Sequence, residues 1–150
     1  MIPFIIKEGL YDPGIFKAFF LAGGPGSGKT YVNKKIFPGL GLKNVNSDDA
    51  VERALKKAGI SMDFTQGTDD EIKQRMRLRT RAKRTMRKGL EGYIDGRLGL
   101  VLDATARDYD KTTIAKAALD RLGYDTYMIF VNTSLRVALA RNSERERVVH

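Results

Sequence analysis

A single short stretch, residues 18–30, constrains this chain more than any other part of it. The stretch reads AFFLAGGPGSGKT, so four apolar residues run directly into a glycine-rich loop that ends in Lys-Thr. Residues 23–30 match the pattern G-x-x-x-x-G-K-[ST] at every fixed position. Because an apolar strand pattern precedes the loop and a helix-like segment follows it, the sequence predicts a strand, a phosphate-binding P-loop and a helix in succession.

Each fixed residue type of this loop meets a physical requirement for holding a triphosphate. Glycines allow successive backbone N–H groups to turn inward around a phosphate, and the following helix directs its positive end toward the same anion. The Lys29 ammonium would reach the β- and γ-phosphates, and the Thr30 hydroxyl would ligate Mg²⁺. ATP and Mg²⁺ are therefore the expected ligands, and the alternative is a glycine-rich turn that binds nothing. The expected nucleotide-binding residues of the loop are Gly24, Gly26, Ser27, Gly28, Lys29 and Thr30.

The composition limits the class of protein and its partners. A chain of 150 residues is expected to form one domain, and without Cys it has neither disulfides nor thiolate metal sites, which suits the cytoplasm. The N-terminus is apolar for only six residues and no run approaches a membrane span, so no membrane association is expected. The net charge of +9 favours a polyanionic partner such as nucleic acid or nucleotide, and a solvated basic surface is an equal alternative.

Strand-like and helix-like segments alternate along the chain after an N-terminal arm at residues 1–15. Strands are expected at residues 15–22, 42–47, 98–102 and 125–132. Helices are expected at residues 31–37, 48–58, 69–96, 108–122 and 134–142. This alternation predicts an α/β fold of the P-loop NTPase, nucleotide-kinase-like type. The expected architecture is a three-layer sandwich around a mainly parallel sheet of roughly four strands, joined by right-handed crossovers.

Residue types at the helix ends and along the helices predict caps and buried faces. Ser47 or Asp48 is a suitable N-cap for the second helix, and Thr133 is one for the last helix. The expected inward face of the long helix at 69–96 consists of Ile72, Met76, Ala82, Met86, Leu90, Tyr93 and Ile94. The expected inward face of the last helix consists of Leu135, Val137, Ala138 and Leu139.

Three acidic residues follow predicted strands, where ligands bind in open α/β sheets. Asp48 and Asp49 come after the second strand, and either carboxylate could accept a proton from an attacking hydroxyl or hold Mg²⁺ through water. Acidic residues also suit the first turn of a helix, which is the structural alternative. Asp103 closes the third strand in LVLDATARD and is the expected Mg²⁺-supporting acid.

Basic residues gather in two regions. Nine lie between Glu71 and Lys88, and they indicate either a solvated helix face or a surface that follows phosphates. No aromatic residues interleave with them, which argues against a platform for base stacking. Near the end of the chain, Arg141, Arg145 and Arg147 follow the last strand, where they could close over the γ-phosphate or pair with glutamates. Arg107 could meet a substrate anion or remain an exposed loop charge.

With these features in place, residues 18–149 resemble the P-loop kinases of the zeta toxin and polynucleotide kinase group. GGPGSGKT at residues 23–30 is similar to the P-loop of both families. NVNSDD at 44–49 resembles the strand end that carries the catalytic Asp of polynucleotide kinases, and ALARNSERERVV at 138–149 resembles their arginine-bearing lid. Residues 100–131 look more like zeta toxins, and the spacing from Asp103 to Arg107 is similar to that in nucleoside monophosphate kinases.

The resemblance implies a transfer of the γ-phosphate of ATP to a hydroxyl group. The acceptor in polynucleotide kinases is a nucleic acid 5′-OH, and in zeta toxins it is a sugar hydroxyl of a UDP-aminosugar. Carried over by position, Asp48 would be the general base, although a zeta-like alignment points equally to Asp49. Lys29, Arg141 and Arg145 would stabilise the transferred group, and Arg107 and Arg147 would contact the nucleotide.

Several positions differ from the family patterns. Val51 stands where polynucleotide kinases carry an Arg, with Arg53 nearby, and Ala106 replaces their Asn. Both families continue beyond the position of His150 with a lid closure and at least one further helix. Either the lid-like segment at 141–150 is shortened, or the fold completes itself differently.

The expected function is therefore an ATP-dependent phosphotransferase that acts on a hydroxyl of a nucleic acid or nucleotide-like acceptor. One alternative is a kinase of a UDP-aminosugar or of a small nucleotide. Another is an NTP-binding switch or assembly module without turnover. The sequence indicates no particular protein partner.

Overall fold

The computed structural model describes residues 12, 14–63, 66–104 and 109–143. Within them, strands and helices follow one another in the order that the sequence predicts, with two helices in succession between the second and third strands. The elements are β1 (Lys17–Ala22), α1 (Lys29–Ile36), β2 (Lys43–Val45), α2 (Ser47–Lys57), α3 (Asp69–Asp95), β3 (Leu100–Ala104), α4 (Tyr109–Arg121), β4 (Asp125–Phe130) and α5 (Leu135–Ser143).

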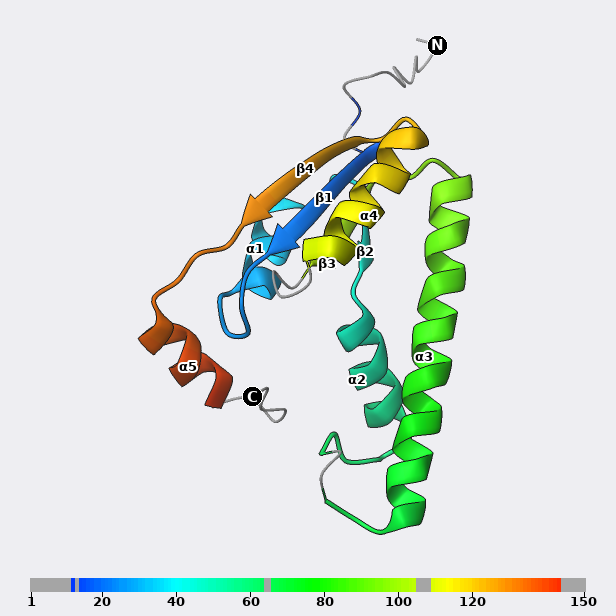
Figure 1. Cartoon of the computed structure of the whole chain (residues 1–150), viewed down its shortest axis with the longest axis vertical. Helices are drawn as coiled ribbons and strands as arrows, with labels where there is room; N and C mark the ends of the chain where they lie inside the picture. Colours follow the sequence, from blue (N-terminus) through cyan, green and yellow to red (C-terminus); the bar gives the residue numbers. More distant parts are fainter. Residues whose placement is uncertain (1–11, 13, 64–65, 105–108, 144–150) are drawn as a thin grey trace, which may run out of the picture.

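The four strands form one parallel sheet in the order β2-β3-β1-β4, with β1 at its centre beside β3 and β4 (Figure 1). β1 is almost wholly buried, which matches its apolar sequence, because a central parallel strand is covered on both faces. The register places Leu21 beside Asp103, so the end of β3 lies next to the start of the glycine-rich loop. The parallel α/β fold predicted from the sequence is confirmed.

Helices cover the two faces of the sheet and create two hydrophobic clusters. On one face, Val32 of α1 and Phe37 pack against Leu21 and Val101. On the other face, Leu119 of α4 packs with strand residues such as Phe20 and Leu100, and α3 adds the partly buried residues Met86, Leu90, Tyr93 and Ile94. The sheet therefore lies between two helical layers, as the three-layer prediction requires.

α3 and α2 form a helical hairpin that extends beyond the sheet (Figure 1). α3 has 27 residues and is therefore about 40 Å long. Val51 and Leu55 of α2 pack against Ala82 of α3 in a third, smaller cluster. The N-terminus of α3 carries a reciprocal capping box, in which Thr68 and Glu71 satisfy each other's backbone N–H groups. The far half of the hairpin thus depends on a small core of its own.

One expected surface charge of α3 is buried. Arg75 is 5% exposed, and its guanidinium donates hydrogen bonds to the carbonyls of Asp63 and Gln66 in the α2–α3 connection. Met76, expected on the inward face, is instead 47% exposed. The apolar spacing of α3 predicts Met76 and not Arg75 on the buried face. An Arg can nevertheless enter a core when its aliphatic part packs there and its guanidinium donates to carbonyl oxygens.

The expected inward face of α5 is wrong at two positions. Leu135 is 74% exposed and Leu139 is 59% exposed, whereas Val137 and Ala138 are partly buried. α5 stands away from the sheet, and the extended residues 131–134 join it to β4 (Figure 1). Ala138 and Arg141 of α5 approach the glycine-rich loop at Gly26 and Gly28.

Two predicted helix caps and the end of the third strand also differ from the structure. Asn46, and neither Ser47 nor Asp48, caps α2, because its Oδ1 accepts the N–H groups of Asp48 and Asp49. At α5 the capping oxygen comes from Ser134, which accepts the Val137 N–H at 3.4 Å, instead of from Thr133. The third strand ends at Ala104, so Asp103 lies within the strand. These shifts of one or two residues reflect side-chain pairing that local sequence does not show.

Among the helices that the structure describes, none combines the length and the apolar character needed to cross a membrane.

Candidate active site

The glycine-rich loop between β1 and α1 requires glycine at particular positions and lies against α5. Gly28 forms the N-cap of α1 with φ of 100°, a left-handed conformation that favours glycine. Gly26 has φ of 77°, and a β-carbon placed on it would overlap the backbone carbonyl of Ala138 in α5. The loop therefore has room for glycine alone at Gly26, because α5 lies directly against it.

Lys29 points back across the mouth of the loop. Its Nζ donates to the carbonyl oxygens of Gly23 at 2.6 Å and Gly24 at 3.1 Å, and it lies 4.0 Å from Asp103 Oδ1. Only 11% of its side chain is exposed. This largely buried side chain forms a preformed positive centre at the end of β1, close to an acid from β3.

Asn46 links the acid of β3 to the start of α2. Its Nδ2 donates to Asp103 Oδ2 at 2.9 Å, while its Oδ1 accepts from the N–H groups of Asp48 at 2.9 Å and Asp49 at 3.2 Å. Since the amide oxygen faces two backbone donors, the amide nitrogen must face Asp103. One side chain therefore sets both the orientation of the Asp103 carboxylate and the position of the α2 N-terminus.

The two neighbouring aspartates differ in their surroundings. Asp49 lines the cleft that contains Lys29 and Asp103, whereas Asp48 is exposed and does not line that cleft. Burial raises the pKa of the Asp49 carboxyl, with repulsion from Glu52 and Asp48 adding to the rise, while Arg53 and Lys34 oppose it. A carboxylate with a raised pKa binds a proton more readily, which is the property that a general base needs.

Lys29, Thr30, Asp49 and Asp103 line one cleft of about 130 Å³ at the carboxyl ends of β1 and β3. A hydroxyl and a carboxylate on one wall are the donor types that Mg²⁺ binds together with waters. The neighbouring Ser27 is 7% exposed and its Oγ has no hydrogen-bond partner among the described residues. A buried polar atom without a partner inside the loop fits a site that is completed by a polar ligand.

The described part of the chain holds no cluster of three or more acidic or His side chains that could bind a metal by themselves. A cation in the cleft would therefore depend on Thr30, Asp103 and the oxygens of a bound phosphate. This donor set is usual for Mg²⁺, which keeps several waters and takes one or two protein carboxylates.

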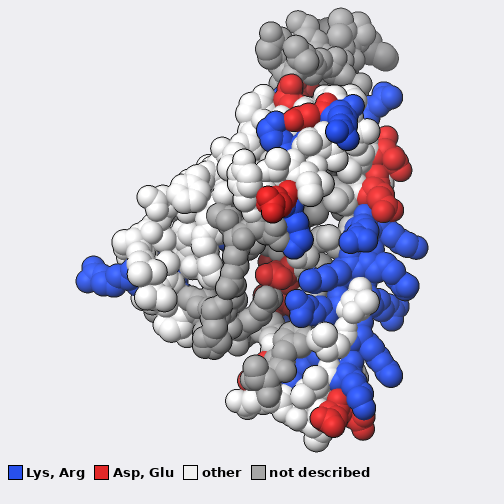
Figure 2. All heavy atoms as spheres, viewed as in Figure 1, with Lys and Arg blue, Asp and Glu red and all other residues white. Residues whose placement is uncertain are grey.

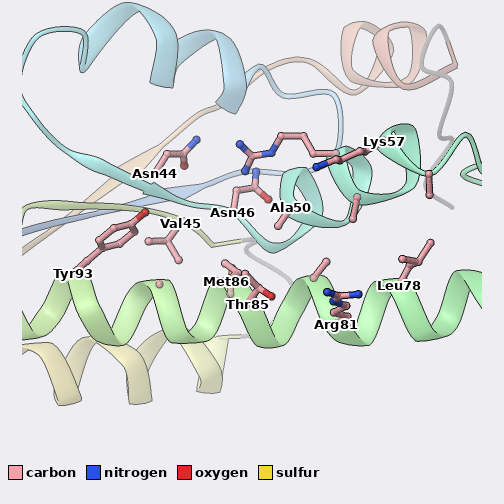
Figure 3. Close-up of a pocket in the computed structure, with 15 residues that line it drawn as sticks. Asn44, Val45, Asn46, Ala50, Lys57, Leu78, Arg81, Thr85, Met86 and Tyr93 are labelled. Atoms are coloured by element: carbon pink, nitrogen blue, oxygen red, sulfur yellow. The ribbon is translucent and has the colours of Figure 1, made fainter.

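A larger groove extends from this cleft along the α2–α3 hairpin. Asn44, Asn46 and Asp49 line both the cleft and an adjoining hollow of about 250 Å³ that also contains Arg53. Arg53 in turn lines a groove of about 700 Å³ between α3 and the β2–α2 segment. Figure 3 shows that Tyr93, Met86 and Thr85 of α3 stand across this groove from Asn44, Val45 and Asn46. Because neighbouring hollows share lining residues, we refer to the three together as the trough, with Lys29 at one end.

The candidate arginines at the end of the chain are only partly described. Arg141 lies over the loop, with Nη1 3.5 Å from the point that a β-carbon on Gly28 would occupy. This position is compatible with the expected contact to a bound phosphate. Arg107, Arg145 and Arg147 lie outside the described residues.

The sequence alone indicated no role for Asn46, and it placed Arg53 only near the position where polynucleotide kinases carry an Arg. Arg53 follows Asp49 by four residues, so both lie on one face of α2, and Arg53 Nε donates to the Asp49 carbonyl at 3.2 Å. The i, i+4 spacing could have identified Arg53. Asn is a preferred N-cap residue, so its place before α2 could have identified Asn46, but its pairing with Asp103 has no local signal because the two residues are 57 positions apart.

Comparisons with known proteins give one family match and a similar fold. The AAA_33 family model, described as an AAA domain, matches residues 19–149. A protein from Chloroflexus aurantiacus J-10-fl, described as a "putative kinase", has a similar structure with a TM-score of 0.58 and 19% sequence identity. The similarity covers 85% of this chain and 65% of that protein, so the chain spans less than two thirds of its length. The comparison with curated proteins found no match.

Proposed function

Because the chain belongs to the AAA_33 family of AAA domains, we propose that it is an ATP-dependent phosphotransferase whose acceptor is a hydroxyl of a nucleic acid or nucleotide-like molecule. The observation that carries the proposal is the shared cleft of Lys29, Thr30, Asp49 and Asp103. Its residues include a candidate phosphate-binding cation, a candidate metal-binding pair and a candidate base, all at the carboxyl ends of the strands. A protein that served only as a nucleotide-binding switch would need the cation and the metal-binding pair but not the base.

Donor binding is assigned to the loop and to the first turn of α1. The backbone N–H groups at Gly24, Gly26, Ser27 and Gly28 would surround the phosphates at the positive end of α1. Lys29 would exchange its two carbonyl partners for phosphate oxygens, and Arg141 would close from α5. Thr30 and Asp103 would hold Mg²⁺, and ATP would supply the γ-phosphoryl group.

Asp49 is the proposed general base, in preference to Asp48. It lines the cleft with Lys29 and its pKa is raised, mainly by burial. In the transfer, the acceptor oxygen forms the new bond to phosphorus, the bond from phosphorus to the leaving oxygen of ADP breaks, and the hydroxyl proton passes to Asp49. Lys29 and Arg141 would neutralise the charge on the transferred group.

The acceptor side of the proposal rests on the trough. Arg53 lies at the junction between the Asp49 hollow and the large groove, where it could bind a phosphate of the acceptor. Beyond it, Val45, Met86 and Tyr93 offer apolar and aromatic surface for a base. A groove of about 700 Å³ is large enough for a nucleotide unit.

The proposal is tested by incubating the protein with radiolabelled ATP and one acceptor at a time. The panel contains oligonucleotides with a free 5′-OH, nucleoside monophosphates, UDP-sugars and water alone. We expect label in an oligonucleotide or nucleotide acceptor. Label only in UDP-sugars would replace the proposal with the aminosugar alternative, and ATP binding without any transfer would replace it with the switch.

Two matched variants test the choice of base. Asp49→Asn should lower transfer by about 10²- to 10⁴-fold, the usual contribution of a positioned base. Asp48→Asn changes the same residue type one position away and should retain most of the activity. The reverse ranking would assign the base to Asp48 and contradict the role proposed for Asp49.

A further inference from the structure

The charges of α3 are segregated along its length. Nine Lys and Arg residues and no acidic residue lie between Glu71 and Glu91, whereas Asp69, Asp70 and Asp95 lie toward the two ends. Figure 2 shows this pattern as a band of basic side chains along α3, with acidic side chains at either end of the band. Arg75 is buried, so eight of the nine basic side chains lie at the surface.

Four of these residues form a stripe on one side of the helix. Arg77, Arg81, Arg84 and Lys88 follow one another at spacings of four, three and four residues, which places them on one face over about 16 Å. This basic stripe borders the trough, because Arg81, its second residue, also lines the large groove. None of the four forms an ion pair with a described residue.

A solvated helix usually alternates positive and negative residues, because pairs at i, i+4 stabilise it and like charges oppose it by a few tenths of a kcal/mol. The middle part of α3 carries basic residues with no acidic residue between them. Its surface ion pairs, such as Lys73 with Asp70, lie outside the stripe. The self-repulsion of the stripe is relieved when a polyanion lies along it.

We propose that the basic stripe binds the sugar-phosphate backbone of a single-stranded nucleic acid, whose terminal nucleotide enters the trough. This inference rests on the proposed function, since it selects a polynucleotide among the acceptors considered there. The stripe provides regularly spaced cations without aromatic residues between them, so it follows phosphates and does not read bases.

The form of the groove favours a single strand over a duplex. The groove is bounded by α3 on one side and by β2 and α2 on the other, and its apolar residues include Tyr93, Met86 and Leu78. A base can contact these side chains only if it is unpaired, because a terminal base pair would carry the second strand into the helix wall. An acidic protein segment would match the charge of the stripe, but it carries no base that would fill the adjoining groove.

The binding experiment uses a fluorescent single strand of about 12 nucleotides and measures its dissociation constant over a series of salt concentrations, without ATP. The test variant is Arg77→Gln/Arg84→Gln/Lys88→Gln, which leaves Arg81 in the groove. The control variant is Arg79→Gln/Lys83→Gln/Arg87→Gln, which removes three exposed charges that follow one another at spacings of four on another face of the same helix. Gln has a helix propensity similar to those of Lys and Arg, so both variants should fold.

We expect the test variant to reduce the slope of log affinity against log salt by about two, since each phosphate contact on a single strand contributes roughly 0.7. The control variant should change this slope by less than half as much. Equal changes in the two variants, or none in either, would overturn the stripe as a specific surface. Tighter binding of duplex, or of poly-glutamate at matched charge, would overturn the choice of partner.

The transfer reaction separates failure of this inference from failure of the proposed function. With the test variant, kcat/KM for an oligonucleotide acceptor should fall several-fold while that for a mononucleotide acceptor stays unchanged. If each acceptor had the same kcat/KM with the variant as with the wild type, the inference would be overturned and the kinase proposal would stay intact. Absence of transfer to every acceptor would reject the kinase, and the salt measurement without ATP would still decide whether the stripe binds nucleic acid.

Discussion

The donor end of the trough and its acceptor end are built in different ways. Around Lys29 the backbone determines the shape: a glycine at position 26 has no room for a β-carbon, the strand ends are buried, and the Lys29 side chain is only 11% exposed. Along the α2–α3 hairpin, the shape comes from side chains on two helices that share a small core. We infer that the donor end tolerates few changes, whereas the acceptor end can vary its residues without loss of the fold.

The strongest test of this contrast is removal of the Lys29 ammonium. Lys29→Ala should lower phosphoryl transfer by about 10³-fold, because the cleft loses the cation nearest to Asp103. Lys35→Ala, on the same helix, removes an exposed ammonium that lies over the Tyr31 ring and should leave transfer nearly unchanged. Steady-state kinetics with the best acceptor of the panel compares them. A similar loss in both variants would mean that general charge, and not this site, governs the reaction.

The second test compares two glycines of the loop. Gly26→Ala forces a left-handed alanine against the Ala138 carbonyl, so we expect a stability loss of roughly 2 kcal/mol and about tenfold weaker ATP binding. Gly24→Ala introduces a β-carbon with nothing within 4 Å and should change little. Chemical denaturation and nucleotide titration measure the two effects. If Gly26→Ala behaved like Gly24→Ala, α5 would not close the loop in solution.

A third test addresses the residue that joins the two ends. Asn46→Ala removes the cap of α2 and the donor to Asp103, so the expected cost is about 1 kcal/mol, or roughly 3 °C in the melting temperature. Ser47→Ala is the matched control, since Ser47 provides no cap in the structure. Calorimetry of both variants gives the comparison. If Ser47→Ala lost more stability than Asn46→Ala, the cap of α2 would be assigned to Ser47, the residue that the local sequence favours.

The smallest expected effect is the pH dependence at Asp49. Its pKa is raised in the fold, so the folded state holds this proton more tightly than the unfolded chain, and ionisation disfavours folding. Asp49→Asn should therefore be a few tenths of a kcal/mol more stable than the wild type near pH 7, since the group is partly solvated. The difference should vanish as the pH falls through the folded pKa toward 3.8.

Denaturation at several pH values measures this effect. Asp70→Asn, which removes a fully exposed acid from the first turn of α3, should not raise the stability. If Asp49→Asn were less stable than the wild type at neutral pH, the ionised carboxylate would be stabilised in the fold, which contradicts the raised pKa.

The sequence predicted the order of strands and helices and their boundaries to within a few residues. Apolar runs and glycine punctuation are local properties, and each of them constrains the backbone over a few positions. The glycine-rich loop at residues 23–30 and its place between a buried strand and a helix followed from the same local signals, as did the acid of the third strand. The roles of these residues in binding and transfer stay predictions.

Only the tertiary structure could decide which side chains meet. Asp48 and Asp49 are neighbours of the same type, and the orientation of α2, set by Asn46 and by the packing of Val51 and Leu55, directs only Asp49 into the cleft. Arg75 turned inward because two carbonyls of the α2–α3 connection accept its hydrogen bonds, a pairing that apolar spacing along α3 does not show. Local sequence determines which elements form because propensity acts over a few residues. The partners of polar side chains depend on packing between segments far apart in the chain, and that packing exists only in the folded protein.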